Sequence, residues 1–418
     1  MQKKISLFIV LLSIILLFMS MYHKNMQFLS QIPPYHSVRP SDFPEKTQKT
    51  GSDLSVISKT DTPSSLRAKA CCLLDADTEQ VLYAKEGDKK MPMASTTKIM
   101  TCIVALENGN IKDTVTASSY AASMPDVQLN MRAGETFLLK DLLYSLMLES
   151  HNDTAVAIAE HIGGSVEKFA AMMNEKAIEL GCVNTNFVTP NGLDSKEHYT
   201  TAKELCIIAA YAIKNDQFLK IIRTPSHQFS NCEGTRKYQV RNHDAFLTSY
   251  PGAIGIKTGF TGNAGYCFCG AAKKGKQTLI TSVLACGWPP NKSWKWKDTA
   301  ALMDYGFHNF KNVALTPSEL PSSLPVTDGA KCSVKIRSLT PKSLTFTLRE
   351  EDTLCRKISL PKTAVAPIRK GDIIGYDKYY KNGELLYDFP ILAQSSCSSR
   401  GLPYYRRLIK GMFLFSGE

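Results

Sequence analysis

The spacing of hydrophobic residues changes along the chain and predicts a block of helices between two sets of strands. Apolar residues recur every three to four positions, as on one buried helix face, in residues 99–106, 138–147, 156–162, 166–180 and 294–310. Gly109, Gly163 and Gly181 close three of these segments, as expected where helices end. Thr201 with Glu204 forms a capping-box pattern and predicts one more helix start.

Runs of apolar residues bounded by turn residues predict strands before and after the helices. The runs 71–74 and 81–83 flank the turn-forming segment 75–78, which indicates a hairpin. Two longer runs cover 264–272 and 277–286. Strands on both sides of a helical block predict an α+β fold for residues 67–312, in which helices cover both faces of an antiparallel sheet.

The pattern changes again between residues 313 and 325, where three prolines mark a boundary. Short alternating runs follow at 332–336, 344–348, 354–360, 372–376 and 384–392. Lys381-Asn382-Gly383 is typical of a tight hairpin turn. This spacing predicts a small all-β domain over residues 313–395.

The N-terminal pattern indicates export. Lys3 and Lys4 precede an apolar run from Ile5 to about Met21, so residues 1–24 are expected to be a signal peptide or an uncleaved N-terminal anchor. The anchor is favoured because no alanine, and therefore no small-residue cleavage site, precedes Ala68. Residues 25–66 are rich in Pro, Ser, Thr and Lys, a composition that predicts a flexible linker.

The C-terminal tail, residues 396–418, has the pattern of an amphipathic helix. Its apolar residues at helical spacing are Tyr405, Leu408, Ile409, Met412 and Phe415, and Arg406, Arg407 and Lys410 lie off that face. A basic side opposite an apolar side is typical of a helix lying in a membrane interface. The alternative is a helix docked on the β domain.

Composition narrows the possible partners. A chain of 418 residues suits two or three domains, and its net charge of +12 favours an anionic surface. No nucleic-acid-binding motif accompanies the charge, so an anionic membrane or cell wall is expected rather than nucleic acid. The 12 cysteines are scattered in apolar runs without metal-ligand spacing, which predicts free buried thiols and no metal site.

Three short motifs occur in a fixed order and carry candidate chemistry: Ser95-Thr96-Thr97-Lys98, Ser150-His151-Asn152 and Lys257-Thr258-Gly259. Enzymes that acylate a serine with a penicillin or a D-Ala-D-Ala peptide use such a set. Each motif alone has an ordinary explanation: a solvated helix turn, a helix N-cap, or a glycine bulge beside a surface lysine. Their joint occurrence in this order favours the catalytic interpretation.

The residue types suit serine acylation. Ser95 and Lys98 share a helix face, so the Lys98 amine can act as a base if burial or the charge of Lys257 keeps it neutral. We expect Ser150 to relay a proton, and Asn152 to hold both Lys98 and the substrate carbonyl. His151 receives no role.

The third motif has the features of a substrate-binding strand. Lys257 and Thr258 can hold a free carboxylate, and Gly259, which has no Cβ, allows a substrate backbone to approach. An oxyanion hole needs two aimed N–H groups, for which we predict those of Ser95 and Phe260.

On these motifs the chain resembles the low-molecular-weight penicillin-binding proteins of the serine D-Ala-D-Ala carboxypeptidase family. The resemblance covers roughly residues 68–392 and extends to 92–101, 160–165, 189–193 and 251–267. It implies a β-lactamase/transpeptidase-like catalytic domain, no metal or cofactor, and β-lactams as covalent inhibitors. His151 departs from the Gly or Ala that is commoner in the family. The family's additional basic residue upstream of the third motif falls between Arg241 and His243.

The sequence therefore predicts a serine-type D-Ala-D-Ala carboxypeptidase that trims peptidoglycan stem pentapeptides at the outer face of the cytoplasmic membrane. A class A β-lactamase is one alternative, but the Glu-x-x-Leu-Asn run that it needs for deacylation does not occur between Asn152 and Lys257. The other is a non-catalytic penicillin-binding module, against which the complete motif set argues.

Overall fold

The computed structural model describes residues 45–49, 63, 65–401 and 404, and it divides the chain into two compact units. The first, called the helix–sheet unit, extends to Pro317 and includes Lys342–Asp352. The second, called the β unit, holds Ser318–Pro341, the chain from Thr353 and the N-terminal strand at Glu45–Lys49. The predicted signal or anchor and the amphipathic tail beyond Gly401, apart from Tyr404, lie outside the described residues.

The helix–sheet unit is built on a five-stranded antiparallel sheet. In spatial order its strands are β3 (Val81–Lys85), β2 (Ala70–Asp75), β10 (Gln277–Leu284), β9 (Gly265–Lys274) and β8 (Ala253–Thr261). The predicted 71–83 hairpin and the two longer strands are confirmed. β8 is an edge strand, which leaves one side of its backbone unpaired within the sheet.

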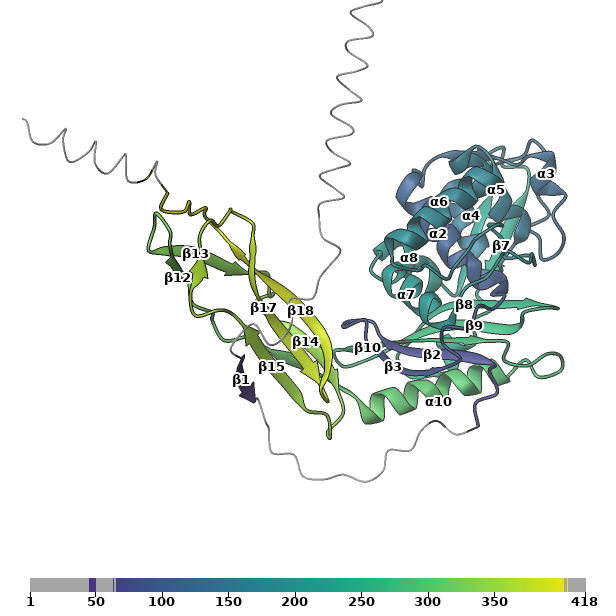
Figure 1. Ribbon diagram of the computed structural model, residues 1–418. Coiled ribbons are helices and arrows are strands. Elements are labelled where there is room, and N and C mark those ends of the chain that lie inside the picture. Colours follow the sequence, from purple (N-terminus) through teal and green to yellow (C-terminus); the bar gives the residue numbers. More distant parts are fainter. Residues whose placement is uncertain (1–44, 50–62, 64, 402–403, 405–418) are drawn as a thin grey trace, which may run out of the picture. The chain divides into compact units, whose positions relative to one another are not determined.

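Helices cover both faces of this sheet, as predicted. They are η2 (Ala94–Thr97), α2 (Lys98–Asn108), α3 (Ser119–Ala122), α4 (Leu139–Leu148), α5 (Asn152–Gly163), α6 (Val166–Glu179), α7 (Ala202–Ala212), α8 (Asp216–Ile222), α9 (Phe246–Ser249) and α10 (Trp294–Asn309). Figure 1 shows α10 along one face and the other long helices on the opposite side.

Because helices pack on both faces of the sheet, β2 is buried on both sides. Cys72 and Leu74 belong to the core under α7, whereas Cys71 and Leu73 belong to the core under α10. A strand with one solvated face would alternate between apolar and polar residues, but β2 reads Ala-Cys-Cys-Leu-Leu-Asp and is buried throughout.

Most helix ends follow the predicted signals. α2 ends before Gly109, and α6 ends just before Gly181, which has a φ of 77°. The Thr201 hydroxyl caps α7 by accepting a hydrogen bond from Glu204 N at 3.2 Å. The Glu204 carboxylate accepts hydrogen bonds from Asn184 N instead, so the reciprocal half of the capping box is not among the described contacts.

Three two-stranded sheets complete the helix–sheet unit. They pair β4 (Thr114–Thr116) with β5 (Thr136–Leu138), β6 (Ser226–Ser230) with β7 (Lys237–Arg241), and β11 (Lys311–Leu315) with β14 (Leu344–Leu348). β11 and β14 fall wholly or partly within the all-β domain expected at 313–395, and by their contacts they group with the helix–sheet unit.

The β unit is a sheet with the order β1-β15-β17-β18-β13-β12-β16. Its strands are β1 (Glu45–Lys49), β12 (Ser323–Thr327), β13 (Ser333–Ser338), β15 (Leu354–Ser359), β16 (Ala364–Val365), β17 (Ile373–Lys381) and β18 (Glu384–Ala393). The predicted turn at Asn382 and Gly383 joins β17 to β18. β1 pairs antiparallel with β15, although the sequence assigned residues 45–49 to a linker.

The cysteines are free thiols, as predicted. All 12 lack a disulfide partner, and nine are buried. Burial raises the pKa of Cys71 and of Cys182 to about 12, which keeps these thiols protonated and unreactive.

Candidate active site

Ser95 lies in the 3-10 turn η2, directly before Lys98 opens α2. The Thr96 and Thr97 hydroxyls donate hydrogen bonds to carbonyls at the start of this turn, at 2.7 and 2.8 Å, and so fix its geometry. In a 3-10 turn, residues i and i+3 are stacked above one another. The Ser95 hydroxyl and the Lys98 amine therefore lie side by side, as the first motif predicts.

Lys98 is completely buried and its amine has three oxygen neighbours. The Nζ atom lies 3.0 Å from Ser95 Oγ, 2.9 Å from Asn152 Oδ1 and 2.6 Å from the Asn191 carbonyl. The last two oxygens can only accept hydrogen bonds. A neutral amine has two N–H groups for these two acceptors, which leaves its lone pair for the Ser95 hydroxyl.

The surroundings of Lys98 favour the neutral amine. Burial lowers the pKa of Lys98 well below its usual value, and the positive charge of Lys257 lowers it further. The buried carboxylate of Asp153 acts in the opposite direction. Burial and the charge of Lys257 thus act on Lys98 in the direction that the sequence analysis expects.

The second motif joins α4 to α5. Asn152 begins α5, and its amide nitrogen donates to the Pro125 and Asp126 carbonyls at 3.1 and 3.2 Å, so that its Oδ1 faces Lys98. Ser150 has a φ of 69°. Its Oγ is buried and has no hydrogen-bond partner among the described residues, so no described contact joins it to Ser95 or Lys98.

His151 points into a separate polar cluster. Its ring contacts Ser145 Oγ at 2.8 Å and Glu149 Oε2 at 3.1 Å. Burial lowers the pKa of His151 to about 4. The sequence analysis gave His151 no role, and no described hydrogen bond joins its ring to Ser95 or Lys98.

The third motif lies on the edge strand β8. Lys257 is 2% exposed, and its ammonium donates to the Thr258 carbonyl at 3.2 Å. A Cβ on Gly259 would lie 3.0 Å from Ser95 N and 3.1 Å from the Met93 carbonyl. A side chain here would therefore need η2 to give way by a few tenths of an ångström, so the close approach of η2 favours glycine in addition to any approach of a substrate.

Phe260 follows Gly259 on β8 and its side chain is 43% exposed. Its ring lies 4.7 Å from the Tyr266 ring, centroid to centroid. β8 meets the Ser95 amide at Gly259. Phe260 is the next residue along β8, so its backbone follows directly after this contact. This placement is compatible with the predicted pair of oxyanion donors.

The expected basic residue upstream of β8 falls in the segment that leaves β7. Arg241 is the exposed last residue of β7, and its backbone N–H donates to Glu149 Oε1. His243 N donates to the Leu148 carbonyl. No hydrogen bond joins either residue to Lys257 among those described.

Three residues that the motifs did not single out complete the site. The Asn191 carbonyl accepts from Lys98, and the neighbouring Pro190 carbonyl accepts from Thr101 Oγ1 at 2.6 Å. The completely buried Asp153 carboxylate accepts hydrogen bonds from Leu129 N and Met131 N. The Thr-Pro-Asn-Gly turn at 189–192 was the only available signal, and it indicates a turn without indicating what its carbonyls bind.

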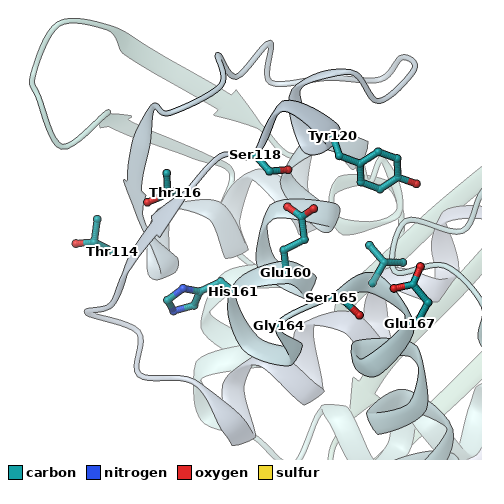
Figure 2. Close-up of a pocket in the computed structure, with 10 residues that line it drawn as sticks. Thr114, Thr116, Ser118, Tyr120, Glu160, His161, Gly164, Ser165 and Glu167 are labelled. Atoms are coloured by element: carbon teal, nitrogen blue, oxygen red, sulfur yellow. The ribbon is translucent and has the colours of Figure 1, made fainter.

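A separate cavity of about 380 Å³ lies between α3, β4 and the end of α5 (Figure 2). Threonine and serine hydroxyls, Tyr120, Glu160 and His161 line it. None of the predicted site residues is among its lining residues. Within the described ranges, no group of three or more His, Cys, Asp or Glu side chains could hold a metal ion, and no helix is long and apolar enough to cross a bilayer.

Comparison with protein families gives two matches. Residues 57–287 match the model of the D-alanyl-D-alanine carboxypeptidase family, and residues 311–398 match that of the C-terminal domain of penicillin-binding protein 5. The D-alanyl-D-alanine carboxypeptidase DacF of Bacillus subtilis is 33% identical over 343 residues, covering 80% of this chain and 87% of that protein. The corresponding DacA of Haemophilus influenzae is 30% identical and covers 77% and 83%.

Solved structures give the same picture. Penicillin-binding protein 5 from Haemophilus influenzae superposes with a TM-score of 0.68 and 26% identity, covering 81% of this chain and all of that one. The Streptomyces K15 DD-transpeptidase superposes with a TM-score of 0.56 and 32% identity, covering 60% of this chain. These likenesses confirm the predicted catalytic fold followed by an all-β domain.

Proposed function

This chain belongs to the D-alanyl-D-alanine carboxypeptidase family, and we propose that it removes the terminal D-alanine from peptidoglycan stem pentapeptides through an acyl-enzyme on Ser95. The observation that carries the proposal is the completely buried Lys98 amine, 3.0 Å from Ser95 Oγ, with both of its neutral-form N–H groups engaged elsewhere. An amine in this arrangement is a general base for the serine.

Acylation begins when Ser95 Oγ attacks the carbonyl carbon of the penultimate D-alanine. Lys98 takes the hydroxyl proton, and the tetrahedral intermediate carries its negative charge on the former carbonyl oxygen. When the C–N bond breaks, the proton passes to the leaving amine, with the Ser150 hydroxyl of the second motif as the proposed relay. Terminal D-alanine leaves. Water then attacks the ester, with Lys98 again accepting a proton, and Ser95 is regenerated.

Two features of the edge strand suit a substrate that ends in a carboxylate. Lys257 and the Thr258 hydroxyl bind the free carboxylate of terminal D-alanine, while the backbone N–H groups of Ser95 and Phe260 stabilise the oxyanion. The open edge of β8 can pair with the extended peptide. Asn152 holds Lys98 and contacts the substrate's amide.

The assay that tests this function measures D-alanine release from diacyl-L-Lys-D-Ala-D-Ala. The protein should release one D-alanine per peptide, and Ser95→Ala should abolish release while leaving the fold intact. A wild-type protein that binds penicillin but releases no D-alanine would support the non-catalytic module instead. Fast hydrolysis of benzylpenicillin would support the β-lactamase alternative, because a carboxypeptidase of this kind deacylates the penicilloyl enzyme slowly.

We propose further that the protein works at the outer face of the cytoplasmic membrane, held there by its termini. The support is the apolar run in residues 1–24 and the amphipathic pattern in 396–418. A protein without residues 1–24 should sediment with anionic vesicles, and removal of residues 400–418 should abolish this binding while activity on soluble peptide is retained. Equal sedimentation with and without the tail would exclude the tail as an anchor.

A further inference from the structure

A second buried carboxylate lies behind the substrate-binding strand. Asp244 is 7% exposed and belongs to the loop between β7 and α9. Its Oδ2 accepts a hydrogen bond from Ile256 N at 3.1 Å, and its Oδ1 accepts one from Phe246 N at 3.0 Å. A Cβ on Gly255, at the bulge of β8, would lie 3.2 Å from Oδ2. The carboxylate is therefore fixed against the backbone one residue before Lys257.

Lys257 needs such a partner. Its ammonium is buried, and its described hydrogen bond goes to an uncharged carbonyl. A buried ammonium without a compensating negative charge tends to lose its proton. Burial lowers the pKa of Lys257 to about 8, and the negative charge of Asp244 opposes this decrease.

The other ionisable groups near this pair do not replace Asp244. Lys98 on α2 and Lys295 on α10 are cationic or neutral, and Cys269 faces Lys257 across the β9 ladder. α8 carries Asp216 and Lys220, both exposed to solvent, and α9 carries no ionisable side chain.

We propose that Asp244 is a positioning residue for the proposed reaction, whose buried carboxylate keeps the Lys257 ammonium charged so that it can hold the substrate's terminal carboxylate at mildly alkaline pH. The inference rests on the function proposed above. Asp244 touches neither substrate nor reacting atoms; it acts through Lys257. Its effect is confined to the pH range in which Lys257 titrates.

The sign of the effect follows from this arrangement. Neutralising Asp244 lowers the pKa of Lys257 further, so Lys257 loses its charge at lower pH and the alkaline limb of kcat/KM moves down. A nearby opposite charge shifts a pKa by about one unit or more. At pH values above the alkaline limbs of both proteins, kcat/KM of the neutralised variant should therefore be about tenfold lower than that of the wild type. The acid limb belongs to Lys98, whose pKa responds to Lys257 and Asp153, and it should not move.

The experiment compares the pH dependence of kcat/KM for the D-Ala-D-Ala peptide in the wild type and in Asp244→Asn, which keeps the shape and an acceptor oxygen. The acylation rate by benzylpenicillin, which also carries a carboxylate, is measured alongside. We expect the alkaline limb to move down in both assays, mostly through KM, with less than a twofold change at pH 6.5. An unshifted limb in a folded variant would overturn the proposal.

Asp298→Asn is the matched control. Asp298 is also buried, at 2% exposure, and also accepts two backbone N–H groups, from Arg67 and Ala68, but its charge is not among those acting on Lys257. An equal shift in this variant would mean that loss of a buried carboxylate, rather than the charge beside Lys257, moves the limb. Circular dichroism melts establish that each variant is folded.

Two further variants test the origin of the alkaline limb independently of Asp244→Asn. Asp244→Ser is a second neutral replacement, and it should shift the limb in the same direction. Lys257→Arg should abolish the limb near pH 8, because a guanidinium does not titrate there, and Asp244→Asn should then shift nothing. A limb that persists in Lys257→Arg would overturn the proposal even if neither neutral variant folds. If the wild-type protein releases no D-alanine at any pH, the proposed function itself has failed; release with an unshifted limb refutes only this inference.

Discussion

The proposed chemistry depends on the amine of Lys98. Its two acceptors, Asn152 Oδ1 and the Asn191 carbonyl, both lie within 3 Å, at 2.9 and 2.6 Å, and cannot donate. They orient the amine and leave its lone pair towards Ser95. The two acceptors therefore position the Lys98 amine and also favour its neutral, basic form.

Replacement of Lys98 should abolish this base. We expect Lys98→Ala to lower the rate of acylation by benzylpenicillin by about 10²-fold or more, the usual size of a general-base contribution. Lys98→Arg should not restore the rate, because a guanidinium does not give up its proton. Stopped-flow or gel-based detection of a fluorescent penicillin measures both variants, and near-normal rates in either would assign the base to another group.

The pH profile of the wild type should be bell-shaped. Lys98 must be neutral to accept the proton, so activity is lost as pH falls through its lowered pKa. Lys257 must be charged to hold the carboxylate, so activity is lost as pH rises through a pKa of about 8. Initial rates of D-alanine release from pH 5 to 10 check this expectation. A profile that keeps rising above pH 9 would exclude a titrating Lys257.

At this scale the motifs predicted the side chains that meet around Lys98, but not the other groups that act on this amine. Ser95, Lys98 and Asn152 come together as the spacing implied. Asn191 contributes a backbone carbonyl, which no side-chain pattern encodes. Asp244 acts through burial, which depends on packing that the sequence does not state.

At the scale of elements, the site depends on how closely two segments approach η2. The turn at Gly192 and the strand at Gly259 both reach its backbone: a Cβ on Gly192 would lie only 2.1 Å from the Ala94 carbonyl oxygen. Gly192 also has a φ of 86°. The Asn191 carbonyl and the Ser95 hydroxyl can share Lys98 only because these backbones touch.

Gly192→Ala should therefore damage the site more than an ordinary left-handed glycine would. Gly181 is the matched control, with a φ of 77° and open space around its Cβ position. Gly181→Ala should cost about 1–2 kcal/mol of stability through backbone strain alone. Gly192→Ala should cost more and lower penicillin acylation at least about tenfold, because η2 must shift. Denaturant melts and acylation rates test the pair, and equal effects of the two substitutions would contradict the contact.

The element boundaries were predicted best where periodicity and an end signal coincide. α6 follows its apolar face from Val166 and stops before Gly181, whereas β1 reads Glu-Lys-Thr-Gln-Lys and has no hydrophobic alternation to reveal it. β14 was recognised as a strand, but its grouping with the helix–sheet unit was not predicted. A strand pattern states the local conformation and not its partner, which here is β11.

At the scale of the whole molecule, the β unit has its own polar centre. Arg356 on β15 donates from Nε and one terminal nitrogen to both Asp377 oxygens at 2.8 Å, and from the other terminal nitrogen to the Ser318 carbonyl at 3.0 Å. Arg356 is 5% exposed and Asp377 is completely buried. Removal of one partner of a buried ion pair leaves an uncompensated charge.

Arg356→Ala should destabilise the β unit by about 3–5 kcal/mol without affecting the chemistry. Arg369→Ala provides the control, because it removes a solvent-exposed arginine of the same unit. Urea unfolding should show an early transition only in Arg356→Ala, while acylation by penicillin at 25 °C stays within twofold of the wild type. Loss of acylation in the folded variant would show that the two units are functionally coupled.

In the proposed reaction, Ser95 is acylated by the carbonyl that a D-Ala-D-Ala peptide or a β-lactam presents. The most direct test is mass spectrometry of the protein after incubation with benzylpenicillin, followed by digestion and peptide mapping. We expect one intact penicilloyl group per chain, located on Ser95, and no adduct in Ser95→Ala. An adduct on any other residue, or an unmodified wild-type protein at saturating drug, would contradict it.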